Sequence, residues 1–303
     1  MARPLVSVCI PTYNHASVIG DALGSAMEQD YANLEFVVLD NASTDVTRTV
    51  VDTLANGDAR VRYVRNNINL GMVGNFNACI LAARGDFIKF LCADDLLMPD
   101  CVATMTDAFV QNPEVALVAS ARLLVDDALV PIRTAGFSSR SFLIDGSSVI
   151  QDCFFRGNLI GEPTAVMFRR EQALRGFRED YPQLMDLEMW MHLLQFGSMS
   201  YIAWPLCKVR QHPQQATQKN LASGVVLDNK RRLFREFHGV VSGATFMDKL
   251  RWDIRMAVTL LRTTQAQFAD VQPNVEEVYF LSMFSWFTRP VARLIWVFVG
   301  RMR

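Results

Sequence analysis

Residues 87–100 read FIKFLCADDLLMPD, and the abrupt change of polarity inside this stretch is the best guide to the fold. An apolar run from Phe87 to Cys92 is typical of a buried strand, and two adjacent carboxylates, Asp94 and Asp95, follow it at once. Two like charges side by side disfavour each other unless water or a cation relieves them. The acids therefore mark either a cation site at a strand end or the entrance of a helix at Cys101–Phe109.

Three similar β-branched runs precede this one, spaced by roughly thirty residues, the length of a βαβ unit. Between the runs, apolar residues recur with helical periodicity. The predicted strands are Val6–Ile10, Leu34–Leu39, Val61–Val64 and Phe87–Cys92, with helices over residues 18–27, 46–54 and 73–81. Continuous apolar strands that alternate with helices predict an α/β fold whose parallel sheet is covered on both faces.

Polar residues follow each of the four strands. They are Pro-Thr-Tyr-Asn at 11–14, Asp-Asn at 40–41, Arg-Asn-Asn at 65–67 and the two acids at 94–95. Because ligands of open α/β sheets bind at the carboxyl ends of the strands, we expect half of a nucleotide pocket here. The sequence has no G-x-G-x-x-G turn and no P-loop, so a divalent metal held by carboxylates is the expected source of positive charge.

Composition narrows the class of protein. The 303 residues are 50% hydrophobic and 20% charged, enough for one large core or two modest domains. A formal net charge of -1 argues against nucleic acid as the main partner. The six cysteines form no CxxC pair, and neither a signal peptide nor a run of about 20 apolar residues is present, so we expect a cytoplasmic protein with reduced thiols.

Three further residues are candidates for chemistry. Asp40 could accept hydrogen bonds from a base or a ribose, although it could also cap the following helix. Asp186 lies on a predicted helix, where a single acid is usually a cap or a surface charge. His212 follows Arg210 by two residues, so both can share one face of an extended segment, the imidazole ligating a metal and the guanidinium binding phosphate. A lone histidine in a loop is more often simply solvated.

The rest of the chain is mixed and then helical. Further strands are predicted at 115–119, 123–125, 165–168 and 201–203, with a short helix at 170–174 and mainly helices beyond Asn220. Residues 278–303 contain no acid but carry arginines among large apolar side chains. Such a segment favours peripheral contact with a membrane surface. The alternative is that its apolar faces pack against the rest of the chain.

Six segments together resemble the inverting family 2 glycosyltransferases of the GT-A fold. They are VSVCIPTYNH (6–15), VVLDNASTD (37–45), the stretch from Asn66 through FLCADDLLMPD, GEPTAVMFRRE (161–171), MDLEMWMHL (185–193) and VRQHPQQAT (209–217). The resemblance covers about Leu5 to Thr217. It implies a GT-A, Rossmann-like, mostly parallel sheet flanked by helices over residues 1–220. A nucleotide-sugar half would span about 1–112 and an acceptor half about 113–220. A helical C-terminal region with a membrane-associating segment would occupy 221–303.

The resemblance also implies the residues of the site. Asp186 would be the general base, and Mn²⁺ or Mg²⁺ would be held by Asp94, Asp95 and His212. The residues implied in nucleotide-sugar binding are Pro11, Tyr13, Asn14, Asp40, Asn69, Gly71, Asn75 and Asp94. The implied reaction moves a sugar from a nucleoside diphosphate sugar to a hydroxyl of a glycan or lipid-linked acceptor, in cell-surface polysaccharide or lipid-linked glycan assembly.

Three positions depart from the family pattern. Cys92 and Asn41 stand where acids are usual, and Met185 replaces the Glu that commonly precedes the base. These changes leave open a catalytically silent nucleotide-sugar-binding or scaffold protein of the same fold. Nucleotidyl transfer is a second enzymatic alternative, although the basic, glycine-rich opening that it favours is absent.

Overall fold

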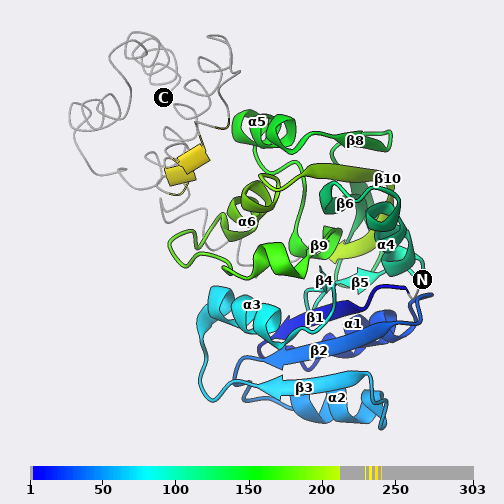
Figure 1. The fold of residues 1–303 in the computed structure, drawn as a ribbon. Coiled ribbons are helices and arrows are strands. Elements are labelled where there is room, and N and C mark those ends of the chain that lie inside the picture. Colours follow the sequence, from blue (N-terminus) through cyan, green and yellow to red (C-terminus); the bar gives the residue numbers. More distant parts are fainter. Residues whose placement is uncertain (1–2, 212–228, 230–231, 234–235, 238–239, 241–303) are drawn as a thin grey trace, which may run out of the picture. The chain divides into compact units, whose positions relative to one another are not determined.

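The computed structural model describes residues 3–211, together with 229, 232–233, 236–237 and 240. The chain divides into two compact units, and the first comprises Met1–Ile150 and Asn158–His212. The description below concerns this first unit (Figure 1). The predicted boundary near residue 220, the helical C-terminal region and residues 278–303 lie outside the described residues.

One mixed sheet runs through this unit, in the order β3-β2-β1-β4-β9-β6-β10-β5, with β7 paired to β6 and β8 paired to β10 (Figure 1). The strands are β1 Val6–Thr12, β2 Leu34–Asp40, β3 Val61–Arg65, β4 Phe87–Phe90, β5 Leu96–Leu97, β6 Val115–Val125, β7 Pro131–Ala135, β8 Phe142–Ile144, β9 Val166–Arg169 and β10 Ser198–Arg210. The helices are α1 Ile19–Met27, α2 Thr47–Ala55, α3 Gly71–Ala82, α4 Cys101–Gln111, α5 Gly146–Arg156 and α6 Met185–Leu193, with 3₁₀ turns η1 Pro163–Ala165 and η2 Arg170–Ala173.

The first four strands confirm the predicted parallel sheet. β1 pairs in parallel with β2 on one side and with β4 on the other, and every residue of β1 and β2 is buried. Side chains of β1 alternate between faces, so Val8 joins the apolar cluster around α1 and α4 whereas Cys9 contacts Cys79 of α3. Burial on both faces explains why these strands read as continuous apolar runs.

The order of strands reverses at β1. After β1 the chain adds β2 and β3 on one side of it, and then β4 on the other side. The backbone N–H of Leu91 donates to the carbonyl of Cys9 at 2.9 Å, which extends the β1–β4 ladder up to the diacid segment. The carboxyl ends of β1 and β4 therefore meet at a topological switch point, the usual ligand position in such sheets.

The second half of the sheet differs from the expectation in three respects. The strands predicted at 115–119 and 123–125 are one strand, β6, and the residues at 201–203 belong to the 13-residue strand β10. β9 runs antiparallel to both β4 and β6, and β5, β7 and β8 were not predicted. The reason lies partly in β10, whose register shifts on both sides of Pro205 break the alternation that a sequence pattern needs.

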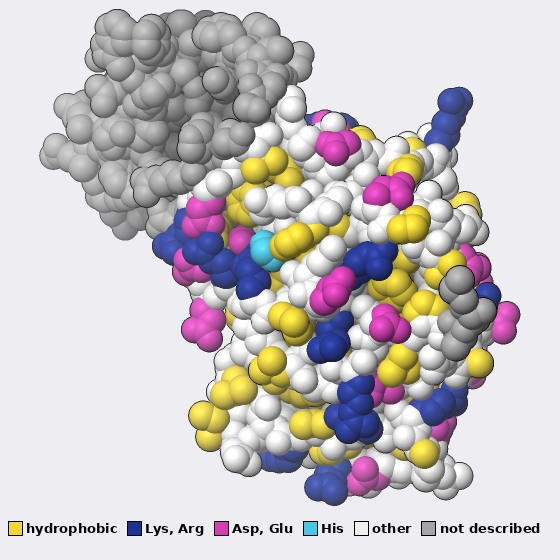
Figure 2. Space-filling view, in the orientation of Figure 1, with side chains coloured by type: hydrophobic (Ala, Val, Ile, Leu, Met, Phe, Trp, Pro, Cys, Tyr) yellow, Lys and Arg dark blue, Asp and Glu magenta, His cyan; other side chains and the backbone are white. Residues whose placement is uncertain are grey.

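The surface of the described residues carries charges of both signs. Figure 2 shows acidic and basic side chains interspersed over the face in view, with no wide field of one sign on its described part. None of the described helices is both long and apolar enough to cross a bilayer.

Candidate active site

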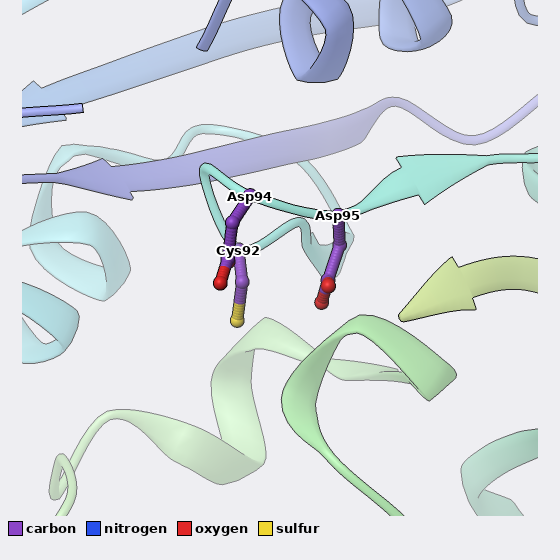
Figure 3. Close-up of side chains that lie close together, drawn as sticks. All are labelled: Cys92, Asp94 and Asp95. Carbon is purple, nitrogen blue, oxygen red and sulfur yellow. The ribbon is translucent and has the colours of Figure 1, made fainter. Parts of the chain in front are cut away.

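The segment after β4 gathers three possible metal ligands. Cys92, Asp94 and Asp95 each place one ligand atom within 4.8 Å of the others, and their side chains point to the same side of the segment (Figure 3). Helix α4 begins only at Cys101 and has Asp100 as its N-cap residue. The alternative in which Asp94 and Asp95 open that helix is therefore wrong.

Asp95 is almost completely enclosed, with 3% of its surface exposed. Its Oδ2 accepts a hydrogen bond from Thr164 Oγ1 at 2.5 Å, and its Oδ1 accepts one from the backbone N–H of Arg210 at 3.0 Å. Burial raises the pKa of the Asp95 carboxyl well above its usual range, and the neighbouring charge of Asp94 adds to the effect. A cation would oppose both causes.

Arg210 supports the diacid segment. Its Nε donates to the carbonyl of Asp94 at 2.8 Å, its Nη1 to the carbonyl of Asp127 at 2.6 Å, and its Nη2 to the carboxylate of Asp21 at 2.6 Å. The guanidinium is thus directed at protein oxygens, and the interpretation of Arg210 as a phosphate ligand is replaced by a structural one. His212 lies outside the described residues.

The donor set partly fits a divalent metal. Carboxylate oxygens are the ligands that Mn²⁺ and Mg²⁺ prefer, and Asp94 and Asp95 supply them. The Cys92 thiol is a softer group, and burial raises its pKa well above the usual range, so it is poorly suited to Mg²⁺. The residues present therefore fit a metal held through the two aspartates.

Asp40 lies at the end of β2, next to the carboxyl end of β1, and it is fully buried. Its carboxylate accepts hydrogen bonds from the backbone N–H and the hydroxyl of Ser43, from the Tyr63 hydroxyl at 2.7 Å and from Arg65 Nη1 at 3.0 Å. Burial and the bond to Asp40 raise the pKa of Tyr63. Asp40 thus organises the loop after β2, and its contact with a nucleoside stays a prediction.

Four asparagines form a network beside Asp40. Asn41 Nδ2 donates to Asn69 Oδ1 at 2.8 Å and to the carbonyl of Gly71 at 3.1 Å. Asn66 Nδ2 donates to Asn41 Oδ1 at 3.1 Å and to Asn75 Oδ1 at 3.0 Å. The structure therefore brings Asn69, Gly71 and Asn75 together, and their contact with a nucleotide sugar stays a prediction. The network also explains why an asparagine stands at position 41, because an aspartate could not donate hydrogen bonds to the two oxygens that the Asn41 amide contacts.

The loop after β1 is tied to the loop after β2. The backbone N–H of Asn14 donates to Ser43 Oγ at 2.9 Å, and Asn14 Oδ1 accepts from the backbone N–H of Thr44 at 2.8 Å. Asn14 has a positive φ of 55°, a conformation that asparagine tolerates well. Pro11 is buried within β1, whereas Tyr13 is 42% exposed. Tyr13 thus presents its ring at the predicted nucleoside end.

Asp186 lies in the first turn of α6. Its Oδ2 accepts from Asn158 Nδ2 at 2.9 Å, and its Oδ1 accepts from the backbone N–H of Leu187 at 2.7 Å. Burial raises the pKa of Asp186 to about 6, and the charge of Glu162 contributes. Helix α6 is buried nearly all round, including Glu188, which pairs with Arg175 at 2.8 Å.

A loop missed by sequence reasoning joins the two acidic groups. At one end Asn158 donates to Asp186, and at the other the Thr164 hydroxyl donates to Asp95 and accepts from the backbone N–H of Cys92 at 3.0 Å. Between them, Glu162 forms an ion pair with Arg122 of β6. The segment GEPT was the available signal, but it did not show which acids these residues contact. The diacid and Asp186 thus belong to one connected site.

Comparison with known proteins agrees with this arrangement. The family model described as glycosyl transferase family 2 matches residues 7–174. The chain belongs to glycosyltransferase family 2. An uncharacterized protein of Mycobacterium tuberculosis is 36% identical to this glycosyltransferase over 250 residues, which cover 77% of this chain and 75% of that protein.

Two further matches come from more distant proteins. A GalNAc(5)-diNAcBac-PP-undecaprenol beta-1,3-glucosyltransferase of Campylobacter jejuni is 37% identical over 103 residues, 34% of this chain and 33% of that one. A mannosyltransferase of Pyrobaculum calidifontis, solved with GDP-Man and Mn²⁺, superposes with a TM-score of 0.60 at 20% identity, covering 99% of this chain and 81% of that one. The GT-A fold and the glycosyltransferase class expected from sequence are thereby confirmed.

Proposed function

We propose that this glycosyltransferase moves a sugar from a nucleoside diphosphate sugar to a hydroxyl of a glycan or lipid-linked acceptor, with inversion at the anomeric carbon. The nucleotide-sugar donor follows from the family and from the similarity to the mannosyltransferase solved with GDP-Man. A lipid-linked acceptor is supported by the similarity to the Campylobacter enzyme, whose name specifies an undecaprenol-linked substrate. Assembly of a cell-surface polysaccharide or a lipid-linked glycan is the corresponding process.

The placement of Asp186 in the first turn of α6, with a hydrogen bond to each of its carboxylate oxygens, is the observation that carries the proposal. Desolvation raises its pKa to about 6, so the carboxylate is ionised at neutral pH yet more basic than an exposed aspartate. A base near the working pH is the best proton acceptor for an attacking hydroxyl. Because both carboxylate oxygens accept a hydrogen bond, the group has a defined orientation. One base in line with a direct displacement produces inversion.

The diacid segment supplies the other half of the proposed chemistry. Asp94 and Asp95 would hold Mn²⁺ or Mg²⁺, with His212 as a proposed third ligand, and the ion when bound would stabilise the charge that develops on the departing diphosphate. Arg210 and Thr164 hold the segment in place. The nucleoside is proposed to lie near Tyr13 and over the loops that Asn14, Asp40 and the asparagine network organise, with Pro11, Asn69, Gly71 and Asn75 at its borders.

A panel of nucleotide sugars with Mn²⁺, offered with undecaprenyl-diphosphate-linked acceptors, tests the proposal through release of the nucleoside diphosphate. We expect Asp186→Asn to abolish release while a donor-induced thermal shift is retained. Full turnover by Asp186→Asn would remove the base assignment. Donor binding by the wild type without turnover of any donor would instead favour the silent binding protein.

The proposed location is the cytoplasmic face of a membrane, with peripheral contact through residues 278–303. That segment contains arginines and no acids, which supports contact with an anionic membrane surface. Flotation with anionic liposomes, comparing the full chain with a truncation after Pro273, provides the test. Equal flotation of both forms would contradict the contact.

A further inference from the structure

The loop from Asn158 to Thr164 has a closely determined conformation near Asp186. Asn158 Oδ1 accepts from the backbone N–H of Gly161 at 3.0 Å, and Asn158 Nδ2 lies 3.2 Å from the carbonyl of Gly161. That carbonyl also accepts from Trp190 Nε1 of α6 at 3.0 Å. Gly161 has a φ of +122°, and a Cβ there would lie 3.0 Å from Arg122 Nη1, so only glycine fits. The loop is thereby fastened to the helix that carries Asp186.

Asn158 orients the carboxylate of Asp186. Its Nδ2 occupies one oxygen at 2.9 Å, while the backbone N–H of Leu187 occupies the other at 2.7 Å. The Leu187 donor belongs to the same helix and moves with Asp186. Asn158 therefore provides a side-chain contact, from outside the helix, that fixes the position of this carboxylate relative to the rest of the site.

Glu162 acts on the same carboxylate through its charge. It stands four residues after Asn158, and its side chain is 42% exposed and paired with Arg122, whose own side chain is only 11% exposed. Its negative charge opposes ionisation of Asp186, and it acts in the same sense on Asp95. Other charged or titratable groups around α6 are Arg122 on β6, Arg170 and Glu171 on η2, and Arg175, Glu188 and His192.

Arg170, Arg175 and Glu188 are engaged elsewhere. Arg175 and Glu188 pair with each other, and Arg170 donates to the carbonyl of Gly85 at 3.0 Å. His192 is neutral at physiological pH, because burial and then the charge of Arg175 lower its pKa to about 4. Two groups from outside the helix thus affect the pKa of Asp186. Glu162 acts through its negative charge, and Asn158 acts as a neutral hydrogen-bond donor.

We propose that Asn158 and Glu162 are positioning residues for the base: Asn158 orients the Asp186 carboxylate and favours its ionised form, whereas Glu162 favours its protonated form. The inference rests on the proposed function, since it takes Asp186 as the base. A hydrogen bond to a carboxylate stabilises the charge, and a nearby like charge destabilises it. Removing the two groups must therefore change the proton affinity of Asp186 in opposite directions, which a merely structural role would not do.

The test is the pH dependence of kcat/KM for the full chain with its donor, acceptor and Mn²⁺. The acidic limb of the wild type should lie near pH 6, where Asp186 protonates. We expect Asn158→Ala to move this limb upward by about half a unit or more, and Glu162→Gln to move it downward by about the same amount. Loss of Glu162 also leaves the charge of Arg122 uncompensated, which acts in the same downward direction.

A second variant at position 158 controls for a change in the conformation of the loop. Asn158→Asp retains an acceptor for the Gly161 N–H but replaces the donor to Asp186 with an acid, so the limb should move up further than in Asn158→Ala. Matched controls are Asn112→Ala, which removes an amide that donates to Ala108 O, and Glu114→Gln, an exposed acid before β6. Both controls should leave the limb at the wild-type pH.

The outcomes separate this inference from the proposed function. If Asp186→Asn is inactive but the limbs of the Asn158 and Glu162 variants stay in place or move in the same direction, only the positioning roles are overturned. If Asp186→Asn turns over normally, the base assignment fails and the inference fails with it. If the acidic limb moves in opposite directions in the Asn158 and Glu162 variants and stays at the wild-type pH in the controls, the inference and the proposed function are both supported.

Discussion

Two aspartates of the site, the fully buried Asp40 and the partly exposed Asp186, are held in very different ways. Asp40 accepts hydrogen bonds from Ser43, from Tyr63 and from the Arg65 guanidinium, so its charge has a cationic partner. Asp186 has two neutral donors, and the charge acting on it is the negative one of Glu162. A carboxylate with a cation and many donors organises a loop, whereas a poorly compensated one is ready to take up a proton.

The largest expected effect is on turnover. Asp186→Asn keeps the shape of the side chain and an acceptor for the Leu187 N–H but removes the base, so kcat should fall by about 10³-fold. Nucleotide release under saturating donor measures it. Asp40→Asn, folded and assayed alongside, should retain far more activity. If Asp40→Asn lost more activity than Asp186→Asn, the assignment of Asp186 as base and of Asp40 as loop organiser would be contradicted.

The next effect is on stability at Asp40. Asp40→Asn replaces one acceptor by a donor that faces the hydroxyl of Tyr63 and the guanidinium of Arg65, and should lower the free energy of unfolding by about 2 kcal/mol. Urea denaturation measures it. Asp52→Asn, which breaks the exposed pair with Arg48, is the matched control and should change stability by less than about 0.5 kcal/mol. Equal effects at the two positions would mean that the Asp40 contacts contribute nothing special.

Asn41 gives a third test on the same side of the site. Asn41→Asp restores the acid usual in the family but places a carboxylate oxygen against Asn69 Oδ1 and the Gly71 carbonyl. We expect a loss of about 1 to 2 kcal/mol in the free energy of unfolding. Asn33→Asp, an exposed asparagine that donates to Arg3 O, should be nearly neutral. A stabilised Asn41→Asp would show that the network tolerates or prefers the acid.

The smallest effect is a gain of stability. Desolvation makes the ionised Asp186 unfavourable in the folded state, so Asp186→Asn should raise the free energy of unfolding at pH 7.5 by about 1 kcal/mol. The folded pKa of about 6 lies above the unfolded value. The wild type therefore regains stability as pH falls through 6 toward 4, and the advantage of the variant should vanish there. Thermal unfolding at several pH values measures it, and a pH-independent difference would contradict the burial of the charge.

Sequence patterns predicted the first half of the fold well for a specific reason. The strands β1, β2 and β4 are buried on both faces, which leaves nearly continuous apolar runs, whereas the edge strand β3 is only partly buried. The helices between these strands are short and amphipathic. The second half was less predictable because β10 carries register shifts around Pro205 and β7 is largely exposed. Local periodicity cannot describe strands of these two kinds.

Candidate residues followed the same division. The polar strand ends indicated Asp40, Asp94 and Asp95 as site residues, whereas Asp186 was assigned as the base only through the family resemblance. Its helix is buried almost all round, so no periodicity distinguishes a functional acid from the buried Glu188 two positions later. Their partners differ in the folded chain: Glu188 is paired with Arg175, whereas Asp186 accepts a hydrogen bond from the neutral amide of Asn158.

The sequence by itself determined a parallel sheet with polar residues at its carboxyl ends, the family, and the residue types available for the chemistry. These are local properties, since periodicity, strand ends and short motifs extend over a few neighbouring residues. Only the tertiary structure decided how the acids are held. Asn158 reaches Asp186 across 28 positions, Thr164 reaches Asp95 across 69, and Arg210 reaches Asp95 across 115. Desolvation and charge depend on such distant neighbours, so the pKa of a carboxyl is a property of the folded chain.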